Sequence, residues 1–134
     1  TVISKGTGAF MHGPTFMANP LACAIATTAC QLAQHAHEQG EVLRIERKLR
    51  RGLSPAVGLP GVPDVRVKGA IGVIQLTDPA MLNVDAATAA ALREGVWLRP
   101  FRDLIYCMPP FICTDTQIAT IGRGMVAAAQ TAVR

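Results

Sequence analysis

The sequence predicts an α+β domain, with a mostly antiparallel sheet that carries its helices on one face. Three observations predict this class. Apolar residues recur at helical spacing near both ends of the chain, and runs with strand composition lie between them. Half of the 134 residues are apolar, while aromatic residues make up only 4%. This length and composition suit a single helix-rich domain with a modest core.

The first helix is predicted to start at Pro20. Asn19 is a favoured N-cap, and proline suits the first helical position. Apolar residues then recur at helical spacing to about Gly52, with an interruption at Gly40. The pattern predicts either one long kinked helix or two successive helices.

Two strands and a second helical region follow. Residues 54–63 hold three prolines and two glycines and are predicted to form a loop. Residues 65–67 and 71–76 have strand composition. Residues 83–94 form a predicted alanine-rich helix that ends at Gly95.

The last third of the chain is predicted to add a hairpin and a helix. Residues 96–101 and 104–108 are expected to be strands, with a tight turn at 102–103 between them. Residues 114–117, Thr-Asp-Thr-Gln, form a capping box that opens the last helix. We expect this helix to run to about Val133.

Composition excludes several functional classes. The formal charge of the chain is +4. The densest cluster of basic residues, at 44–51, is interleaved with glutamates at helical spacing. This pattern indicates a solvated helix face rather than a nucleic-acid site. No apolar run approaches the length of a membrane span, and the four cysteines show no C-x-x-C spacing. We expect Cys23 and Cys30 to be buried as small hydrophobic residues and the protein to be cytoplasmic. His35 and His37 point in different directions on a helix, so no metal site is expected.

A turn-rich loop before the first helix is a candidate anion site. Gly13-Pro14 is a turn dipeptide, and Thr15 has a short side chain that can donate to a phosphate or carboxylate oxygen. Loop amides and the helix N-terminus at Pro20 would add positive potential. A structural turn without a ligand accounts for the same residues.

Arg99 is the second candidate. Strict alternation in a strand places it on the same face as Trp97 and Phe101. A guanidinium between two aromatic rings is partly desolvated, and its fork matches a carboxylate. An internal salt bridge, for example to Asp103, explains the pattern equally well. Tyr106 is predicted either to line a pocket or to pack.

Two segments carry a resemblance to a known family. They are HGPTFMANPLAC at residues 12–23, and GVWLRPF followed by LIYCMPPFI at residues 95–112. Together with residues 64–74 they resemble class III aminotransferases, which are pyridoxal-phosphate enzymes of fold type I. The likeness covers essentially this whole chain, but only the C-terminal part of that family's sequence. It implies that residues 1–20 end the large cofactor-binding domain and that residues 21–134 form the linking helix and the small C-terminal domain.

The resemblance also implies roles for individual residues. Thr15 and the Pro14 backbone would contact the phosphate of pyridoxal 5'-phosphate in the active site of the neighbouring subunit of a homodimer. Gly13 matches a substrate contact, and Arg99 matches the arginine that receives the substrate carboxylate. The segment around Arg99 further resembles the biotin-biosynthetic branch of the family, which implies an amino-oxononanoate as amino acceptor and S-adenosylmethionine as donor.

Lysine marks a departure from the family pattern. Transamination needs a lysine that holds the cofactor covalently, and only Lys5, Lys48 and Lys68 are present. Lys5 is too close to the His-Gly-Pro-Thr loop for this role, so no residue of the chain is assigned as catalytic, and the chain alone is expected to be inactive. Two alternatives stay open: another class III aminotransferase, acting on an ω-amino acid or a diamine, and a non-catalytic truncated product.

Overall fold

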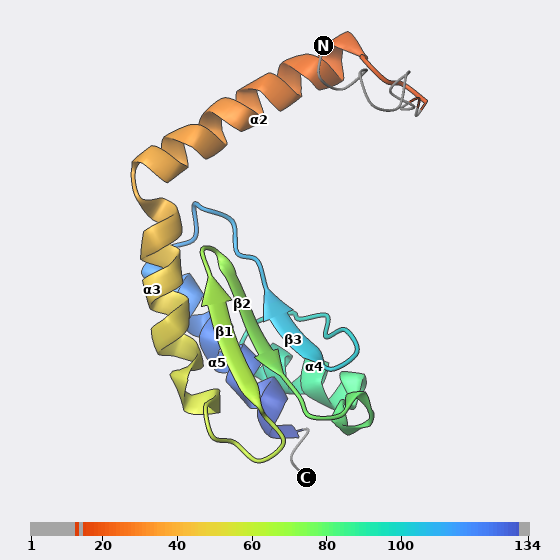
Figure 1. Ribbon diagram of the computed structural model, residues 1–134, viewed down its shortest axis with the longest axis vertical. Coiled ribbons are helices and arrows are strands. Elements are labelled where there is room, and N and C mark those ends of the chain that lie inside the picture. The colour runs from red at the N-terminus through yellow and green to blue at the C-terminus, as the bar shows by residue number, and fades with distance from the viewer. Residues whose placement is uncertain (1–12, 14, 132–134) are drawn as a thin grey trace, which may run out of the picture. The chain divides into compact units, whose positions relative to one another are not determined.

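A computed structural model describes residue 13 and residues 15–131 of the chain. The chain divides into two compact units, Thr1–Gln34 and His35–Arg134. The first unit consists, in its described part, of a turn over residues 15–18 and most of helix α2 (Pro20–Glu38). The second unit holds all of the strands and the remaining helices of the described residues (Figure 1).

Helix α2 begins where the sequence predicts. The Asn19 side chain accepts a hydrogen bond from the Ala22 N–H at 3.1 Å, so Asn19 caps the helix and Pro20 takes the first helical position. The expected burial of Cys23 and Cys30 is wrong: both are exposed, as α2 buries none of its residues. Apolar spacing predicts a helix with an apolar side, but it does not say what covers that side.

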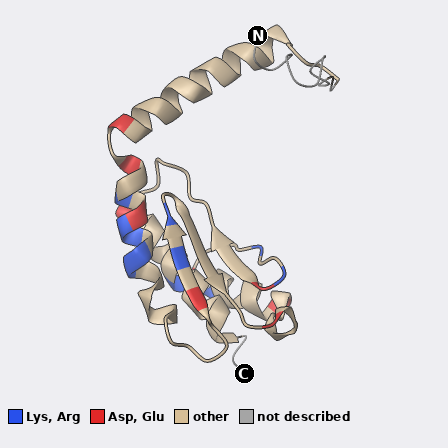
Figure 2. Cartoon of the chain, in the orientation of Figure 1, with Lys and Arg blue, Asp and Glu red and all other residues tan. Residues whose placement is uncertain are grey.

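Gly40 separates α2 from α3 (Glu41–Leu53), so two successive helices form rather than one kinked helix. Its φ of +74° lies in the left-handed region, where glycine has no steric cost. Along α3 the acidic and basic residues follow one another closely (Figure 2). Arg50 forms a salt bridge with Glu46 and also donates a hydrogen bond to the Val67 carbonyl at 2.9 Å. The second contact links α3 to β1 (Asp64–Lys68).

The sheet has three antiparallel strands in the order β1-β2-β3: β1 (Asp64–Lys68), β2 (Ile71–Gln75) and β3 (Leu104–Cys107). Helices α3, α4 (Val84–Arg93) and α5 (Asp115–Thr131) lie on one side of it (Figure 1). The α+β class and the one-sided cover of the antiparallel sheet are therefore confirmed.

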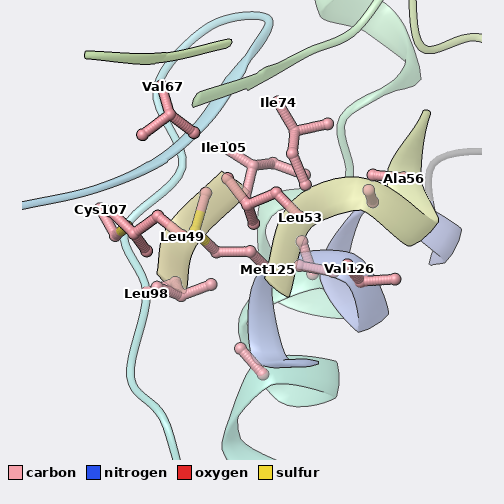
Figure 3. Close-up of a cluster of buried hydrophobic side chains, with 14 of the residues drawn as sticks. Leu49, Leu53, Ala56, Val67, Ile74, Leu98, Ile105, Cys107, Met125 and Val126 are labelled. Carbon is pink, nitrogen blue, oxygen red and sulfur yellow. The ribbon is translucent and has the colours of Figure 1, made fainter. Parts of the chain in front are cut away.

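One face of the sheet forms the core with the helices. Val67, Ile74 and Ile105 come from the three strands and pack against Leu49 of α3 and Met125 of α5 (Figure 3). Burial of such side chains away from water is the main stabilising contribution in a domain of this size. Among the described residues of the second unit, no helix covers the other face of the sheet (Figure 1).

Helix α5 starts with the predicted capping box. The Thr114 N–H donates to the Gln117 side chain at 2.8 Å, and the Gln117 N–H donates to the Thr114 hydroxyl at 3.3 Å. Helix α5 is described to Thr131, so the expected end near Val133 lies outside the described residues.

An ion-pair cluster joins the start of α5 to α3. Asp115 lies 2.6 Å from the Lys48 ammonium and 2.5 Å from the Arg44 guanidinium. The hydrogen bond from Lys48, followed by that from Arg44, lowers the pKa of the Asp115 carboxyl below its usual value. Both partners belong to the basic cluster of the sequence, so part of that charge is used within the fold.

The strand predicted at residues 96–101 is wrong. Only Phe101 pairs, in an isolated bridge with Leu104, while the Val96 N–H turns back to the Ala91 carbonyl of α4 at 3.0 Å. Pro100 has no N–H to donate to a ladder. The segment nevertheless alternates as a strand would, with Leu98 and Pro100 buried between exposed neighbours.

Candidate functional site

Arg99 stands on the extended segment that follows α4. Its side chain is exposed, as are those of Trp97 and Phe101, while Leu98 is buried between them. The three exposed side chains therefore share one side of the segment. At its end, Phe101 and Leu104 exchange two backbone hydrogen bonds of 2.9 Å, so the chain turns at once into β3.

Arg102 occupies this turn with a φ of +56°. The left-handed region is unusual for an arginine and typical of tight hairpin connections. The predicted turn at residues 102–103 is thereby confirmed, although only one of the two flanking segments is a strand.

A hollow of about 270 Å³ opens beside Arg99. It lies between the extended segment and the end of β3, and Trp97, Tyr106 and Met108 line it together with Arg99. The hollow thus combines one cation with an indole, a phenol and a thioether. Sequence alone left Tyr106 undecided between a pocket and packing, and the structure places it in the hollow.

The Arg99 guanidinium has no hydrogen bond or ion pair to any side chain that the structure describes. The salt bridge to Asp103 that the sequence left open is not formed. The Asp103 carboxylate accepts a hydrogen bond from the Gln75 side chain at 2.8 Å. The backbone carbonyl of Asp103 accepts one from the Leu76 N–H, also at 2.8 Å. Gln75 in turn accepts a hydrogen bond from Arg66 at 2.7 Å. Asp103 is therefore held by β2, and Arg99 stays available to an external anion.

Cys107 lines the inner side of the hollow. Burial raises the pKa of its thiol to about 11, so the thiol is protonated at neutral pH. A protonated thiol is a poor nucleophile. Cys107 therefore gives no basis for covalent attack, while the guanidinium fork of Arg99 has the shape to bind a carboxylate.

The second candidate, the loop before α2, belongs to the first unit. Gly13 and Thr15 are both exposed, and nothing lies within 4 Å of where a side chain at Gly13 would begin. Pro14 lies outside the described residues. Phe16 and Ala18 have φ values of +63° and +58°, so the loop turns sharply before the helix begins.

Thr15 and Arg99 thus lie in different units, and each is available for a ligand within its own unit. The hydroxyl of Thr15 has no hydrogen bond to the described part of the chain.

Two lysines, Lys48 and Lys68, are among the described residues. Lys48 is paired with Asp115, and Lys68 ends the edge strand β1. Lys5 lies outside the described residues. Over residues 13 and 15–131, no group of three or more histidine, cysteine or acidic residues is placed to hold a metal ion. Within the same residues, no helix is long and apolar enough to cross a membrane.

The class of protein follows from comparison with known families. The model of the class III aminotransferases matches residues 2–129, so the chain belongs to this family, whose members depend on pyridoxal phosphate. Several relatives carry one name, adenosylmethionine-8-amino-7-oxononanoate aminotransferase. The chain is 53% identical to the Corynebacterium glutamicum protein over 124 residues, which is 92% of this chain and 29% of that protein. It is 53% identical to the Mycobacterium leprae protein over 125 residues, and 34% identical to the Saccharomyces cerevisiae protein over 129 residues.

The chain spans less than a third of the length of these relatives. Solved structures agree on the fold. An (S)-enantioselective ω-transaminase from Thermomicrobium roseum superimposes with a TM-score of 0.76 over 98% of this chain and 32% of its own, at 22% identity. The ornithine aminotransferase of Toxoplasma gondii gives a TM-score of 0.71 over 98% of this chain and 30% of its own, also at 22% identity. The predicted small domain of a fold type I transferase is thereby confirmed.

Proposed function

We propose that this chain is the C-terminal part of a pyridoxal-phosphate-dependent aminotransferase of biotin biosynthesis. The reaction converts 8-amino-7-oxononanoate to 7,8-diaminononanoate, with S-adenosylmethionine as amino donor. The observation that carries the proposal is the 53% identity, over nine-tenths of the chain, to relatives named for this reaction. In the proposed protein, residues 1–20 end the large domain, and residues 21–134 are the linking helix and small domain.

The role proposed for Arg99 is to bind the carboxylate of 8-amino-7-oxononanoate. Three properties support it: the guanidinium is exposed, it has no partner among the described side chains, and it borders a hollow with apolar walls. An arginine fork binds a carboxylate through two parallel hydrogen bonds. This contact would orient the acceptor with its reacting carbonyl carbon at the opposite end.

The role proposed for the loop is to hold the cofactor phosphate. When bound, pyridoxal phosphate supplies the electron sink and carries the amino group between the two substrates. The Thr15 hydroxyl would donate to a phosphate oxygen, with the Pro14 backbone beside it, and Gly13 would leave room for the substrate. The open space around Gly13, the Thr15 hydroxyl, which has no hydrogen bond to a described residue, and the nearby N-terminus of α2 suit an anion of this kind.

A homodimer is part of the proposal, with Thr15 reaching the cofactor of the neighbouring subunit. The apolar residues of α2 support the view that another protein surface covers this helix, since Leu21, Ile25 and Leu32 are each more than 60% exposed. Monomeric proteins rarely leave such a stripe uncovered. A cytoplasmic location is also proposed, and the four free cysteines are consistent with a reducing compartment.

A substrate comparison tests the proposed reaction. The full-length protein that contains this chain is loaded with pyridoxal phosphate and assayed with S-adenosylmethionine and 8-amino-7-oxononanoate. An ω-amino acid and a diamine serve as competing substrates in parallel assays. We expect kcat/KM to be highest for the biotin-pathway pair. A preference for the ω-amino acid or the diamine would replace this assignment with another class III activity, and no turnover of any pair would indicate a non-catalytic product.

A further inference from the structure

The open face of the sheet places Tyr106 next to Arg99. The bridge between Phe101 and Leu104 fixes which residues of the two neighbouring segments lie opposite each other. Arg99 lies two residues before Phe101, and Tyr106 lies two residues after Leu104. Because side chains alternate along extended chains, both project on the same side as Phe101 and Leu104. Both line the same hollow.

The register of the sheet agrees with this arrangement. Tyr106 lies opposite Val73 in β2, and Val73 lies opposite Arg66 in β1. These residues alternate with Ile74 and Ile105, which point into the core. Tyr106 thus projects from the face that no helix of its own unit covers.

The Tyr106 side chain is accessible to a ligand. It is 39% exposed, and its hydroxyl has no hydrogen bond to any described residue. A buried phenol usually has a hydrogen-bond partner in the protein, whereas this exposed one can donate to water or to a ligand. The side chains around the hollow include three that can donate, the phenol of Tyr106, the guanidinium of Arg99 and the indole N–H of Trp97, and the Met108 side chain beside them is apolar.

We propose that Tyr106 is a second carboxylate ligand and a specificity-determining residue for the amino acceptor. Its hydroxyl donates to a remaining lone pair of one carboxylate oxygen while the Arg99 fork engages both oxygens, and the Trp97 ring and the Met108 side chain line the aliphatic chain that follows. The ligand class is a monocarboxylate at the end of a flexible alkyl chain. This inference rests on the proposed function, because it assigns the acceptor's carboxylate to Arg99.

The arrangement separates the two substrates of the reaction. The acceptor presents a carboxylate on a long alkyl chain, whereas S-adenosylmethionine presents a sulfonium cation and a nucleoside beyond its amino acid group. Both substrates carry a carboxylate, but in S-adenosylmethionine it is next to the reacting carbon, whereas in the acceptor it is at the far end of the alkyl chain. A guanidinium and a phenol placed to hold the distant carboxylate therefore favour the acceptor. Removal of the hydroxyl should therefore weaken the acceptor step alone.

The test uses the full-length enzyme with bound pyridoxal phosphate and four forms: wild type, Tyr106→Phe, Arg99→Ala and the double variant. Val57→Ala, an exposed change on the loop after α3, is the matched control for expression and folding. The two half-reactions are followed separately by the absorbance of the cofactor. We expect Tyr106→Phe to raise the KM for 8-amino-7-oxononanoate about tenfold, as for loss of one hydrogen bond to a charged group, and to leave the KM for S-adenosylmethionine unchanged.

The double variant distinguishes a shared ligand from a structural effect. If Tyr106 and Arg99 bind one carboxylate, the two changes should be less than additive, because the hydroxyl loses its target when Arg99 no longer holds the acid. An unchanged acceptor KM in Tyr106→Phe, with a raised KM in Arg99→Ala, overturns the role of Tyr106 and leaves the proposed function standing. A Tyr106→Phe enzyme that weakens both half-reactions equally also overturns it. Unchanged acceptor binding in both single variants contradicts the proposed function itself.

Discussion

The crossing of α3 and α5 depends on two glycines that respond differently to the same substitution. A methyl group at Gly122 would meet the Gly52 backbone at 3.1 to 3.3 Å, and backbone atoms have little freedom to yield. A methyl group at Gly52 would meet the Gly122 Cα at 3.5 Å, which is an ordinary contact. Both residues are helical, so alanine gains up to about 1 kcal/mol of helix propensity at either position.

These distances set the expected magnitudes. Overpacking of a close helix contact costs about 1–3 kcal/mol, which exceeds the gain in propensity. Gly122→Ala should therefore lower the free energy of unfolding by about 1–2 kcal/mol, while Gly52→Ala should leave it unchanged or raise it by less than about 1 kcal/mol. Both helices support the sheet that carries the Arg99 hollow, so Gly122→Ala should also reduce activity on heating.

The measurement is urea denaturation of the full-length protein and the two variants, with the midpoint and slope recorded for each. Gly52→Ala is the control, because it adds the same methyl group on the other side of the same contact. If Gly122→Ala is as stable as Gly52→Ala, the close helix crossing does not limit side-chain size, and the packing described for α3 and α5 is wrong.

Three further predictions concern the loop, the ion-pair cluster and the turn. Thr15→Ala in the full-length enzyme should weaken binding of pyridoxal phosphate, measured by titration of the apoenzyme, and an unchanged dissociation constant would remove Thr15 from the cofactor site. The cations of α3 lower the pKa of Asp115, so the stability that it contributes is present above the ordinary carboxyl pKa and is lost as the pH falls through the lowered pKa. Asp115→Asn should therefore destabilise the protein at pH 7 and lose this effect as the pH falls below the lowered carboxyl pKa in urea titrations, and a pH-independent difference would contradict a role for these ion pairs. Gln75→Leu should release the Asp103 carboxylate to compete for Arg99 and raise the acceptor KM, and Asp103→Asn in the same protein should restore it; failure of that rescue would show that Gln75 does not keep the two apart.

Local sequence signals were sufficient where the physical cause is local. The N-cap at Asn19 and the capping box at Thr114 are satisfied within four residues, so their spacing alone predicts where α2 and α5 begin. The break at Gly40 was visible in the same way, but whether it kinks or ends a helix depends on the backbone angle. The left-handed φ settles that question in favour of two helices.

Signals failed where the outcome depends on distant partners. Residues 96–101 alternate as a strand does, yet a strand also needs a neighbour that accepts its hydrogen bonds, and only Phe101 has one. The periodicity of α2 predicts an apolar side, but no local pattern says that Cys23 and Cys30 are left exposed.

The candidate site shows the same division. The sequence indicated Arg99 and the residues that share its face, because alternation is local. It could not decide between an external carboxylate and Asp103, since the answer lies in the hydrogen bond from Gln75, 28 residues away along the chain. That Tyr106 lies on the same side as Arg99 follows from the bridge between Phe101 and Leu104. The tight turn was predicted from the sequence, but the pairing across it comes from the structure.

Arg99 is proposed to receive the acceptor's carboxylate. The most direct test is the KM for 8-amino-7-oxononanoate in the full-length Arg99→Lys enzyme. Lysine keeps the charge but loses the planar fork that binds a carboxylate through two bonds. We expect the KM for 8-amino-7-oxononanoate to rise by roughly 10- to 100-fold, while the half-reaction with S-adenosylmethionine is unchanged. An Arg99→Lys enzyme that binds the acceptor as tightly as the wild type would show that Arg99 does not hold the acceptor's carboxylate.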